Sequence, residues 1–424
     1  MTLYAQNIDA CFAATIGESG LTDDHLAPFT KRADMALGQL RQAHADRSMP
    51  HLNIVEETAD IDALRPHAAQ FRAECSDVLV LGTGGSSLGG ATLCQLTQDS
   101  AAPQLHFLAN VDPLTFERLF AGLNPASTGI IAISKSGGTA ETLAQLLAVL
   151  KWRGTANTPV IAISEPGARP LRQLAAHFDF PCLDHDPLLG GRFSVFSTGI
   201  LPGLIAGIDV DGLRAGACAA RDQALSAAAG DSAPALGAAV NCAFMTALNN
   251  RQAVLMPYLD QLDRFGKWYR QLWAESLGKK GHGSTPIDAL GTVDQHSQLQ
   301  LYLDGPKDKI FTIITGRHQG YGPTIDITGL TAPLPQDLAY LAGRTMGDLM
   351  AAEQQATIDS LIAGGRPVRV ISVDRLTADC LGALFMHFTL ETIIAADLLA
   401  IDAFDQPAVE DAKIRTRAYL TNMD

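Results

Sequence analysis

The sequence predicts an α/β protein with two domains, each built on a parallel sheet covered by helices. Three observations carry this prediction. Short apolar runs alternate with helical stretches, several of these runs end in turns rich in Gly, Ser and Thr, and the alternation pauses in an Ala-rich stretch before it resumes. Continuous apolar strands that alternate with helices are typical of parallel sheets buried on both faces. With 424 residues, 47% of them hydrophobic, the chain is long enough for two or three domains.

Four parts are expected in chain order: a mostly helical N-terminal arm (1–45), a first α/β domain (46–230), a second α/β domain (231–403) and a C-terminal helix (404–424). In the first domain the apolar runs predict strands at 77–82, 105–108, 129–134, 159–164 and 180–183, and a helix at about 140–151. In the second domain the same reasoning predicts strands at 253–258, 309–314 and 368–373, and helices at 264–279 and 377–399. A terminal helix is expected from Pro407.

Charge and composition exclude several classes of function. The net charge of −14 is spread along the chain without a basic block, so we expect no nucleic-acid partner. The first residues lack the pattern of a signal peptide, and the apolar stretch 234–248 is too short to span a bilayer, so we expect no membrane partner. The seven cysteines are scattered and form no Cys-x-x-Cys pair. This favours a cytoplasmic protein without a disulfide framework or a zinc site.

Two turns that follow expected strands, 82–90 and 134–142, are rich in Gly, Ser and Thr. Ligands of open α/β sheets bind beyond the carboxyl ends of the strands, where the N-termini of helices offer free N–H groups to anions. Glycines allow close backbone approach, and hydroxyls donate to phosphate oxygens. One alternative is that both turns merely close strand–helix junctions, with Thr139 as an N-cap. Two such turns at equivalent points of one sheet favour a phosphate site.

The first turn also invites comparison with standard motifs. A dinucleotide fingerprint fails because Ser87 stands at its third glycine, and a P-loop fails because Ala91 follows Gly90. A nucleophile elbow, Gly-x-Ser-x-Gly, does match at 85–89. The alternative function is therefore a serine hydrolase with Ser87 as nucleophile, although no obvious Asp and His partners follow it.

The second turn, together with the downstream segment 190–195, resembles the sugar-isomerase fold of phosphosugar isomerases. Four further segments narrow this resemblance to the phosphoglucose isomerase (glucose-6-phosphate isomerase) family: 271–279, 291–297, 300–305 and 404–413. The matches keep the family's order from Gly82 to Lys413. The resemblance implies two sugar-isomerase domains and interconversion of D-glucose 6-phosphate and D-fructose 6-phosphate, in glycolysis and gluconeogenesis, without metal or organic cofactor. It also implies a C-terminal helix that closes the active site.

The same resemblance implies a phosphosugar site. The residues that would bind the phosphate or lie beside the substrate are Gly85, Ser86, Ser134, Lys135, Ser136, Thr139, Gln271 and Gln406. Those that would act in catalysis are Glu275 as the base, Arg192 near the C1 and C2 oxygens, His296 in ring opening and Lys413 assisting it. In the family the histidine reaches in from the neighbouring subunit, so a homodimer is expected.

These residue types suit the chemistry. A histidine, with its usual pKa of about 6.5, can donate or accept the proton that opens the sugar ring. A carboxylate in a partly dry pocket can move a proton between C2 and C1 through a cis-enediol(ate). A fixed guanidinium stabilises the negative charge of that intermediate.

Each assignment has a simpler alternative. His282 would serve as well as His296 by residue type alone, and Glu275 could form an exposed helical pair with Lys279. Arg192 could form an interdomain salt bridge. Lys413 could be an ordinary surface lysine beside Arg415 and Arg417. Only the family motif favours the catalytic roles.

The sequence departs from the family at two positions of the site. Gly138 stands where the family usually has a further Thr, and Leu277 replaces a common Asn. These departures put affinity and substrate breadth in doubt, including activity on mannose 6-phosphate. Two other functions stay open: a phosphosugar-binding sensor on the same fold, and an isomerase of a different phosphosugar. A sensor has no use for Arg192, Glu275, His296 and Lys413 together.

Overall fold

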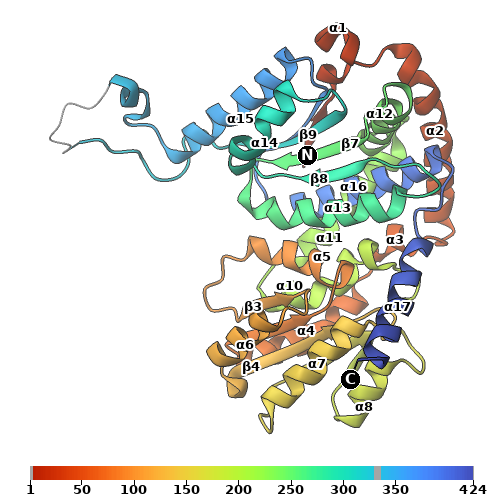
Figure 1. Ribbon diagram of the computed structural model, residues 1–424, viewed down its shortest axis with the longest axis vertical. Helices are drawn as coiled ribbons and strands as arrows, with labels where there is room; N and C mark the ends of the chain where they lie inside the picture. The colour runs from red at the N-terminus through yellow and green to blue at the C-terminus, as the bar shows by residue number, and fades with distance from the viewer. Residues whose placement is uncertain (1–2, 329–335, 424) are drawn as a thin grey trace.

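The computed structural model describes residues 3–328 and 336–423, and it contains two five-stranded sheets stacked along the long axis of the molecule (Figure 1). The first sheet is entirely parallel. Its strands, in spatial order, are β3 (Gln104–Leu108), β2 (Asp77–Leu81), β4 (Thr128–Ile133), β5 (Val160–Ser164) and β6 (Cys182–Asp184). Its inner strands consist almost wholly of buried apolar residues, as expected for a sheet covered on both faces.

The helices of the first half follow the strands in alternation. They are α4 (Ala59–Glu74), α5 (Gly85–Leu93), α6 (Pro113–Gly122), α7 (Ala140–Arg153), α8 (Pro170–His177), α9 (Val195–Thr198), α10 (Ile200–Ile205) and α11 (Val210–Ser226). The N-terminal segment adds α1 (Ala13–Ile16), α2 (Asp23–Ala45) and α3 (Pro50–Asn53). Because β2 and β4 are neighbours, the turns that follow them lie at the same edge of the sheet.

The second sheet is parallel except at one edge. Its strands, in spatial order, are β1 (Ala5–Asn7), β10 (Val368–Val373), β9 (Lys309–Gly316), β7 (Gln252–Pro257) and β8 (Thr285–Asp288), and β1 pairs antiparallel with β10. The helices of this half are α12 (Ala233–Ala247), α13 (Asp263–Leu277), α14 (Val293–Asp304), α15 (Met346–Ala363), α16 (Ala378–Leu398) and α17 (Glu410–Thr421).

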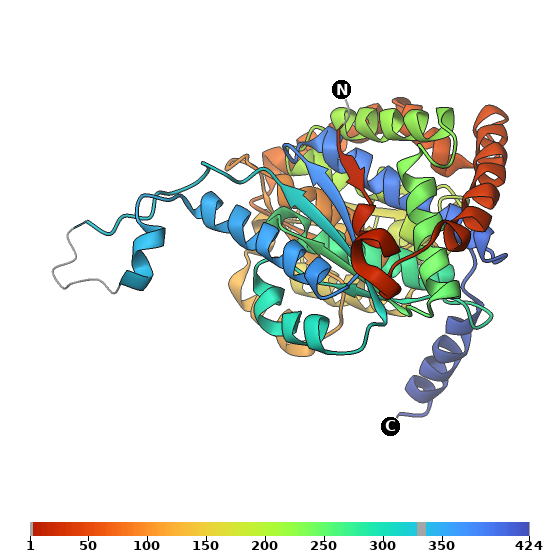
Figure 2. The same cartoon turned by 90° about the horizontal axis from the view of Figure 1, so that it is seen from above.

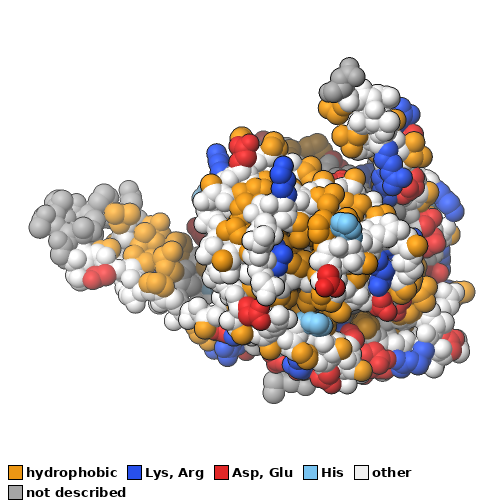
Figure 3. Space-filling view, turned by 90° about the horizontal axis from the view of Figure 1, so that it is seen from below, with side chains coloured by type: hydrophobic (Ala, Val, Ile, Leu, Met, Phe, Trp, Pro, Cys, Tyr) orange, Lys and Arg blue, Asp and Glu red, His pale blue; other side chains and the backbone are white. Residues whose placement is uncertain are grey.

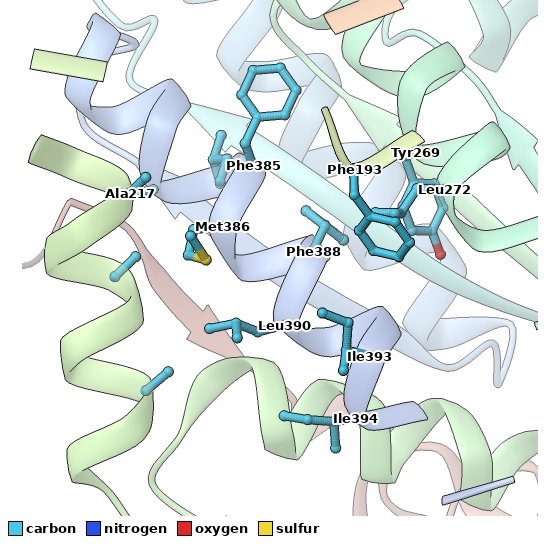
Figure 4. Close-up of a cluster of buried hydrophobic side chains, with 14 of the residues drawn as sticks. Phe193, Ala217, Tyr269, Leu272, Phe385, Met386, Phe388, Leu390, Ile393 and Ile394 are labelled. Atoms are coloured by element: carbon cyan, nitrogen blue, oxygen red, sulfur yellow. The ribbon is translucent and has the colours of Figure 1, made fainter. Parts of the chain in front are cut away.

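One large hydrophobic cluster joins the two halves. Helix α16 runs through it, and its side chains Phe385, Met386 and Phe388 pack toward α11 and α13 (Figure 4). Phe193, from the first half, lies in the same cluster beside Tyr269 of α13 (Figure 4). The two sheets are therefore held by a shared core, and the first-half segment around Phe193 is fixed against α13.

The eight strands expected from the sequence are all present, with bounds shifted by at most two residues. The expected α/β class with two parallel-sheet units is confirmed. Two strands were not expected: β8, and β1 within the arm that we expected to be mostly helical. The domain boundaries at 45, 230 and 403 stay predictions.

Among the described residues, α16 is the one helix that is long and apolar enough to cross a membrane by length and composition. Of its most apolar window 94% is buried inside the fold, as in the core helix of a globular protein. The apolar stretch 234–248 forms α12, most of which is buried. All seven cysteines are free thiols.

Candidate active site

The first Gly-rich turn packs against two other segments of the chain. A Cβ at Gly84 would lie 2.6 Å from Gln271 Nε2, and a Cβ at Gly85 would lie 1.8 Å from the carbonyl oxygen of Gly191. Gly84 also has a φ of 55°, in the left-handed region that favours glycine. These glycines therefore bring the N-terminus of α5 against α13 and against the segment that carries Arg192.

The second turn presents hydroxyls between β4 and α7. The hydroxyls of Ser134 and Thr139 form a hydrogen bond of 2.9 Å, and Ser136 Oγ accepts from the backbone N–H of Gly138 at 3.3 Å. Thr139 does stand at the N-cap of α7, but its side chain makes no capping hydrogen bond. The turn therefore holds a group of hydroxyls at the N-terminal end of α7, and their role in phosphate binding stays a prediction.

Lys135 extends this turn toward an acidic neighbour. Its ammonium lies 3.8 Å from Glu165, whose carboxylate also binds Arg169 at 2.6 Å. Glu165 is mostly buried, at the end of β5. The ammonium of Lys135 therefore lies near Glu165, and its place beside the phosphate stays a prediction.

Arg192 is the most extensively bonded side chain of the region. It is 3% exposed, and Trp268 Nε1 donates to its carbonyl oxygen at 3.1 Å. Its guanidinium donates to five acceptors: Ser276 Oγ (2.8 Å), Glu275 Oε2 (3.2 Å), Gln406 Oε1 (2.6 Å) and the carbonyl oxygens of Ala403 and Asp405. Burial lowers the pKa of the Arg192 guanidinium, and the Glu275 carboxylate opposes this shift. The side chain thus ties the first half of the chain to α13 and to the C-terminal segment.

Glu275 is held between two donors. Gln271 Nε2, one helical turn earlier on α13, donates to Glu275 Oε1 at 3.1 Å, and Arg192 binds the other carboxylate oxygen. The alternative pair with Lys279 is wrong, because Lys279 binds Asp405 at 2.7 Å instead. The alternative of an interdomain salt bridge for Arg192 describes a real contact, since the Arg192–Glu275 ion pair joins the two halves.

Helix α13 presents this face because its opposite face is strongly apolar. Buried Phe265, Trp268, Leu272 and Trp273 anchor it in the shared core. The polar residues of the next face, among them Glu275, are left at the junction of the two halves. An amphipathic pattern in the sequence therefore positions the carboxylate.

The structure does not bring His296 and Lys413 to this cluster. His296 lies on the exposed side of α14, which packs against α15. Lys413 lies on α17, which has no buried residue, and its ammonium binds Glu410 at 2.6 Å. In Figures 2 and 3 α17 stands away from the body of the molecule. His282, the alternative to His296, is also exposed.

Two residues at the cluster were not expected from the sequence. Ser276 accepts from Arg192 Nε, and it could have been suspected because it follows Glu275 in the matched segment. His51 lies among aromatic rings beside Arg192, and no motif pointed to it. Among the described residues there is no group of three or more His, Cys, Asp or Glu side chains arranged to hold a metal ion.

Comparison with known proteins decides the family. A family model described as phosphoglucose isomerase matches residues 67–423. The chain is 39% identical over 376 residues to a probable glucose-6-phosphate isomerase of Haloarcula marismortui, covering 87% of this chain and 83% of that protein. It is 35% identical over 423 residues to a glucose-6-phosphate isomerase of Rubrobacter xylanophilus, covering 95% of each. This chain belongs to the phosphoglucose isomerase family.

The fold agrees with this membership. The solved structure of a hypothetical protein from Thermus thermophilus superposes with a TM-score of 0.86 at 29% identity, covering 98% of this chain and 99% of that one. The family that the sequence resembled is confirmed, and with it the phosphosugar isomerase reaction. The serine-hydrolase alternative is not supported, because Ser87 lies inside α5 and is 2% exposed.

Proposed function

We propose that this phosphoglucose isomerase performs its reaction at the junction of the two halves, between the hydroxyl-rich turns and α13. The reaction interconverts glucose 6-phosphate and fructose 6-phosphate, a step of glycolysis and gluconeogenesis. One observation carries the placement: Glu275 is held between Gln271 and the buried guanidinium of Arg192. A carboxylate and a fixed cation in contact are the two groups that an enediolate intermediate requires.

The phosphate end of the substrate is proposed to bind the second turn. Ser134, Ser136 and Thr139 offer hydroxyls there, and Lys135 adds a positive charge partly offset by Glu165. Gly85 and Ser86 of the first turn border the same edge of the sheet. Hydroxyl donors at the N-terminus of a helix suit a dianionic phosphate.

The proton transfer is assigned to Glu275. With the sugar phosphate bound, its carboxylate takes the proton from C2 and returns it to C1, or the reverse. Arg192 then exchanges its contact with Glu275 for the C1 and C2 oxygens, where negative charge develops. Gln271 and Gln406 keep the carboxylate and the guanidinium in position.

Ring opening is assigned to His296 and Lys413, and for His296 we propose a homodimer. His296 is exposed on α14, where Val293 and Leu301 are also exposed hydrophobic residues. The described parts of the segment 317–345, which stand out from the body in Figures 1 and 2, carry exposed Tyr321 and Tyr340. Exposed apolar side chains on the helix of His296 and on a segment that stands out from the body are what a second subunit would cover. The cytoplasm, where free thiols persist, is the proposed location.

The test is conversion of fructose 6-phosphate to glucose 6-phosphate by the purified chain in the presence of EDTA. Glu275→Gln should lower turnover by about 10³-fold, because it removes the base but keeps the side-chain volume. Phosphosugar binding, measured by calorimetry, should survive in this variant. The matched control is Glu117→Gln on the exposed face of α6, which should turn over as the wild type does.

The outcomes separate the alternatives. Wild-type binding without turnover would favour the sensor function. Undiminished turnover in Glu275→Gln would leave the family intact and show that another group is the base. Faster turnover of a different phosphosugar would show that the substrate differs from that of the named relatives.

A further inference from the structure

His51 is a buried histidine beside the proposed active site. It lies on the short helix α3, is 6% exposed, and neither of its ring nitrogens has a hydrogen-bond partner among the described residues. Buried polar groups are nearly always bonded, so a buried imidazole without partners calls for an explanation. Burial lowers the pKa of His51 to about 4; the Asp186 carboxylate opposes this shift, and the charges of Lys135 and Arg192 add to it. The ring is therefore neutral near pH 7.

The contacts of His51 are made through its ring. Its ring stacks on Phe404, with centroids 4.9 Å apart and planes at 20°. It meets Phe193 edge-on, with centroids 5.2 Å apart and planes at 70°. The rings of Phe193 and Phe404 also pack together, with centroids 5.2 Å apart. Three rings from three distant segments of the chain thus form one cluster.

The two phenylalanines belong to the segments that hold the guanidinium. Phe193 directly follows Arg192, and it reaches into the shared core beside Tyr269 (Figure 4). Phe404 lies between Ala403 and Asp405, whose carbonyl oxygens both accept from Arg192. Gln406, another acceptor of Arg192, follows two residues later.

The C-terminal segment is held by polar bonds and by few buried residues. Ala403 is buried, whereas every described residue from Phe404 to Met423 is exposed. Phe404 is therefore the first residue of the exposed C-terminal segment, and the ring of His51 stacks against it. Lys279 adds a polar tie to the same segment through Asp405.

We propose that His51 is a positioning residue of the isomerase, whose ring holds the 403–406 segment and thereby sets the acceptors of the Arg192 guanidinium. This inference rests on the proposed role of Arg192. A neutral aromatic ring suits this buried position, because burial disfavours a charged imidazole and Arg192 and Lys135 disfavour a positive one. The role requires the faces of the ring and not its nitrogens.

Two substitutions test this role. His51→Phe keeps a ring of similar size and should retain most of the turnover number. His51→Ala removes the stack, and should lower kcat about tenfold or more through misplacement of Arg192. KM for fructose 6-phosphate should change less than twofold, because the phosphate turn is not touched. Phe120→Ala, which removes a comparable stack on Trp152 at 5.0 Å in the first half, is the matched control and should lower only the melting temperature.

A double-mutant cycle separates this inference from the proposed role of Arg192. Arg192→Ala should be strongly impaired alone, and adding His51→Ala should lower kcat no further, because both act through the guanidinium. Full activity of Arg192→Ala would overturn the role of Arg192. An impaired Arg192→Ala beside a fully active His51→Ala would overturn the inference for His51 alone. Equal loss of kcat in His51→Phe and His51→Ala would overturn it too, because the nitrogens would then carry the function.

Discussion

The proposed site consists of two parts that differ in burial and bonding. Arg192, Gln271, Glu275 and Gln406 form one bonded cluster at the junction of the two halves. Lys413 and His296 lie on exposed helix faces and take no part in it. Arg192 is buried to 3% exposure, whereas Lys413 is 57% exposed.

This difference separates the tasks of the groups. The cluster is supported by the apolar face of α13 and by the ring cluster of His51, so packing within the chain fixes its geometry. Electrostatic stabilisation gains most from such preorganisation. Helices α14 and α17 carry the residues proposed for ring opening on the surface, where the proposed second subunit or the substrate would complete the arrangement. We therefore expect the two parts to respond differently to mutation.

The largest effect should come from mixing two inactive variants. Glu275→Gln and His296→Ala should each lose about 10³-fold in turnover. Coexpressed in equal amounts, they should form mixed dimers with one intact site, and activity should return to about a quarter of the wild-type value. The measurement is the specific activity of the purified mixture.

A second pair of variants serves as the control. Glu275→Gln mixed with Arg192→Ala should stay inactive, because both residues belong to the same chain's cluster. Recovery in that pair, or none in the first pair, would contradict the division of the site between two subunits.

Much of the fold could be predicted from the sequence, because the sheets are buried on both faces. The runs that became β4 and β5 contain only buried residues, and an apolar run between two turns leaves few other interpretations. The strands β1 and β8 escaped because they are short and partly exposed, and β1 acquires its place by pairing with β10, far away in the chain. Such pairing has no local signal.

Residues of the proposed site could be predicted from the sequence only where they belong to a family motif. The resemblance of segments 190–195 and 271–279 gave Arg192 and Glu275, which the structure places in contact. Spacing alone would have favoured a pair between Glu275 and Lys279, which does not form. His51 could not be found from the sequence, because its role comes from three segments that meet only in the folded chain.

The cluster should also depend on pH through His51. Its pKa is about 4 in the folded chain and about 6.5 when unfolded, so the unfolded chain takes up a proton first as the pH falls. The stability that this group contributes is therefore complete above pH 6.5 and is lost between pH 6.5 and 4, by roughly 2–3 kcal/mol at pH 4.5. Urea unfolding at pH 7, 5.5 and 4.5 measures it. His51→Phe should lose less stability over this range than the wild type. If the wild type and His51→Phe lose the same unfolding free energy between pH 7 and 4.5, protonation of His51 does not destabilise the fold.

The exposed part should behave in the opposite way, with an effect on turnover and none on stability. Lys413→Ala should lower kcat about 100-fold, because it removes a cation that assists ring opening. The melting temperature should not change, since Lys413 makes only an exposed pair with Glu410. Arg415→Ala on the same helix removes a similar exposed pair with Asp411 and should leave both quantities unchanged. A lower melting temperature in Lys413→Ala alone would mean that α17 is docked in solution.

The smallest expected effect concerns the proposed phosphate turn. There is room for a side chain at Gly138 but not at Gly137. A Cβ at Gly138 would meet only the Ser136 carbonyl oxygen at 4.0 Å, whereas one at Gly137 would lie 2.6 Å from Arg169. Gly138→Thr should therefore fit and add a hydroxyl donor for the phosphate, lowering KM about fivefold, as one net hydrogen bond would. Gly138→Val has the same shape without the hydroxyl and should not lower KM. If valine lowers KM as much as threonine, the gain comes from a stiffer turn, and the preformed character of the Arg192–Glu275 cluster extends to the phosphate turn as well.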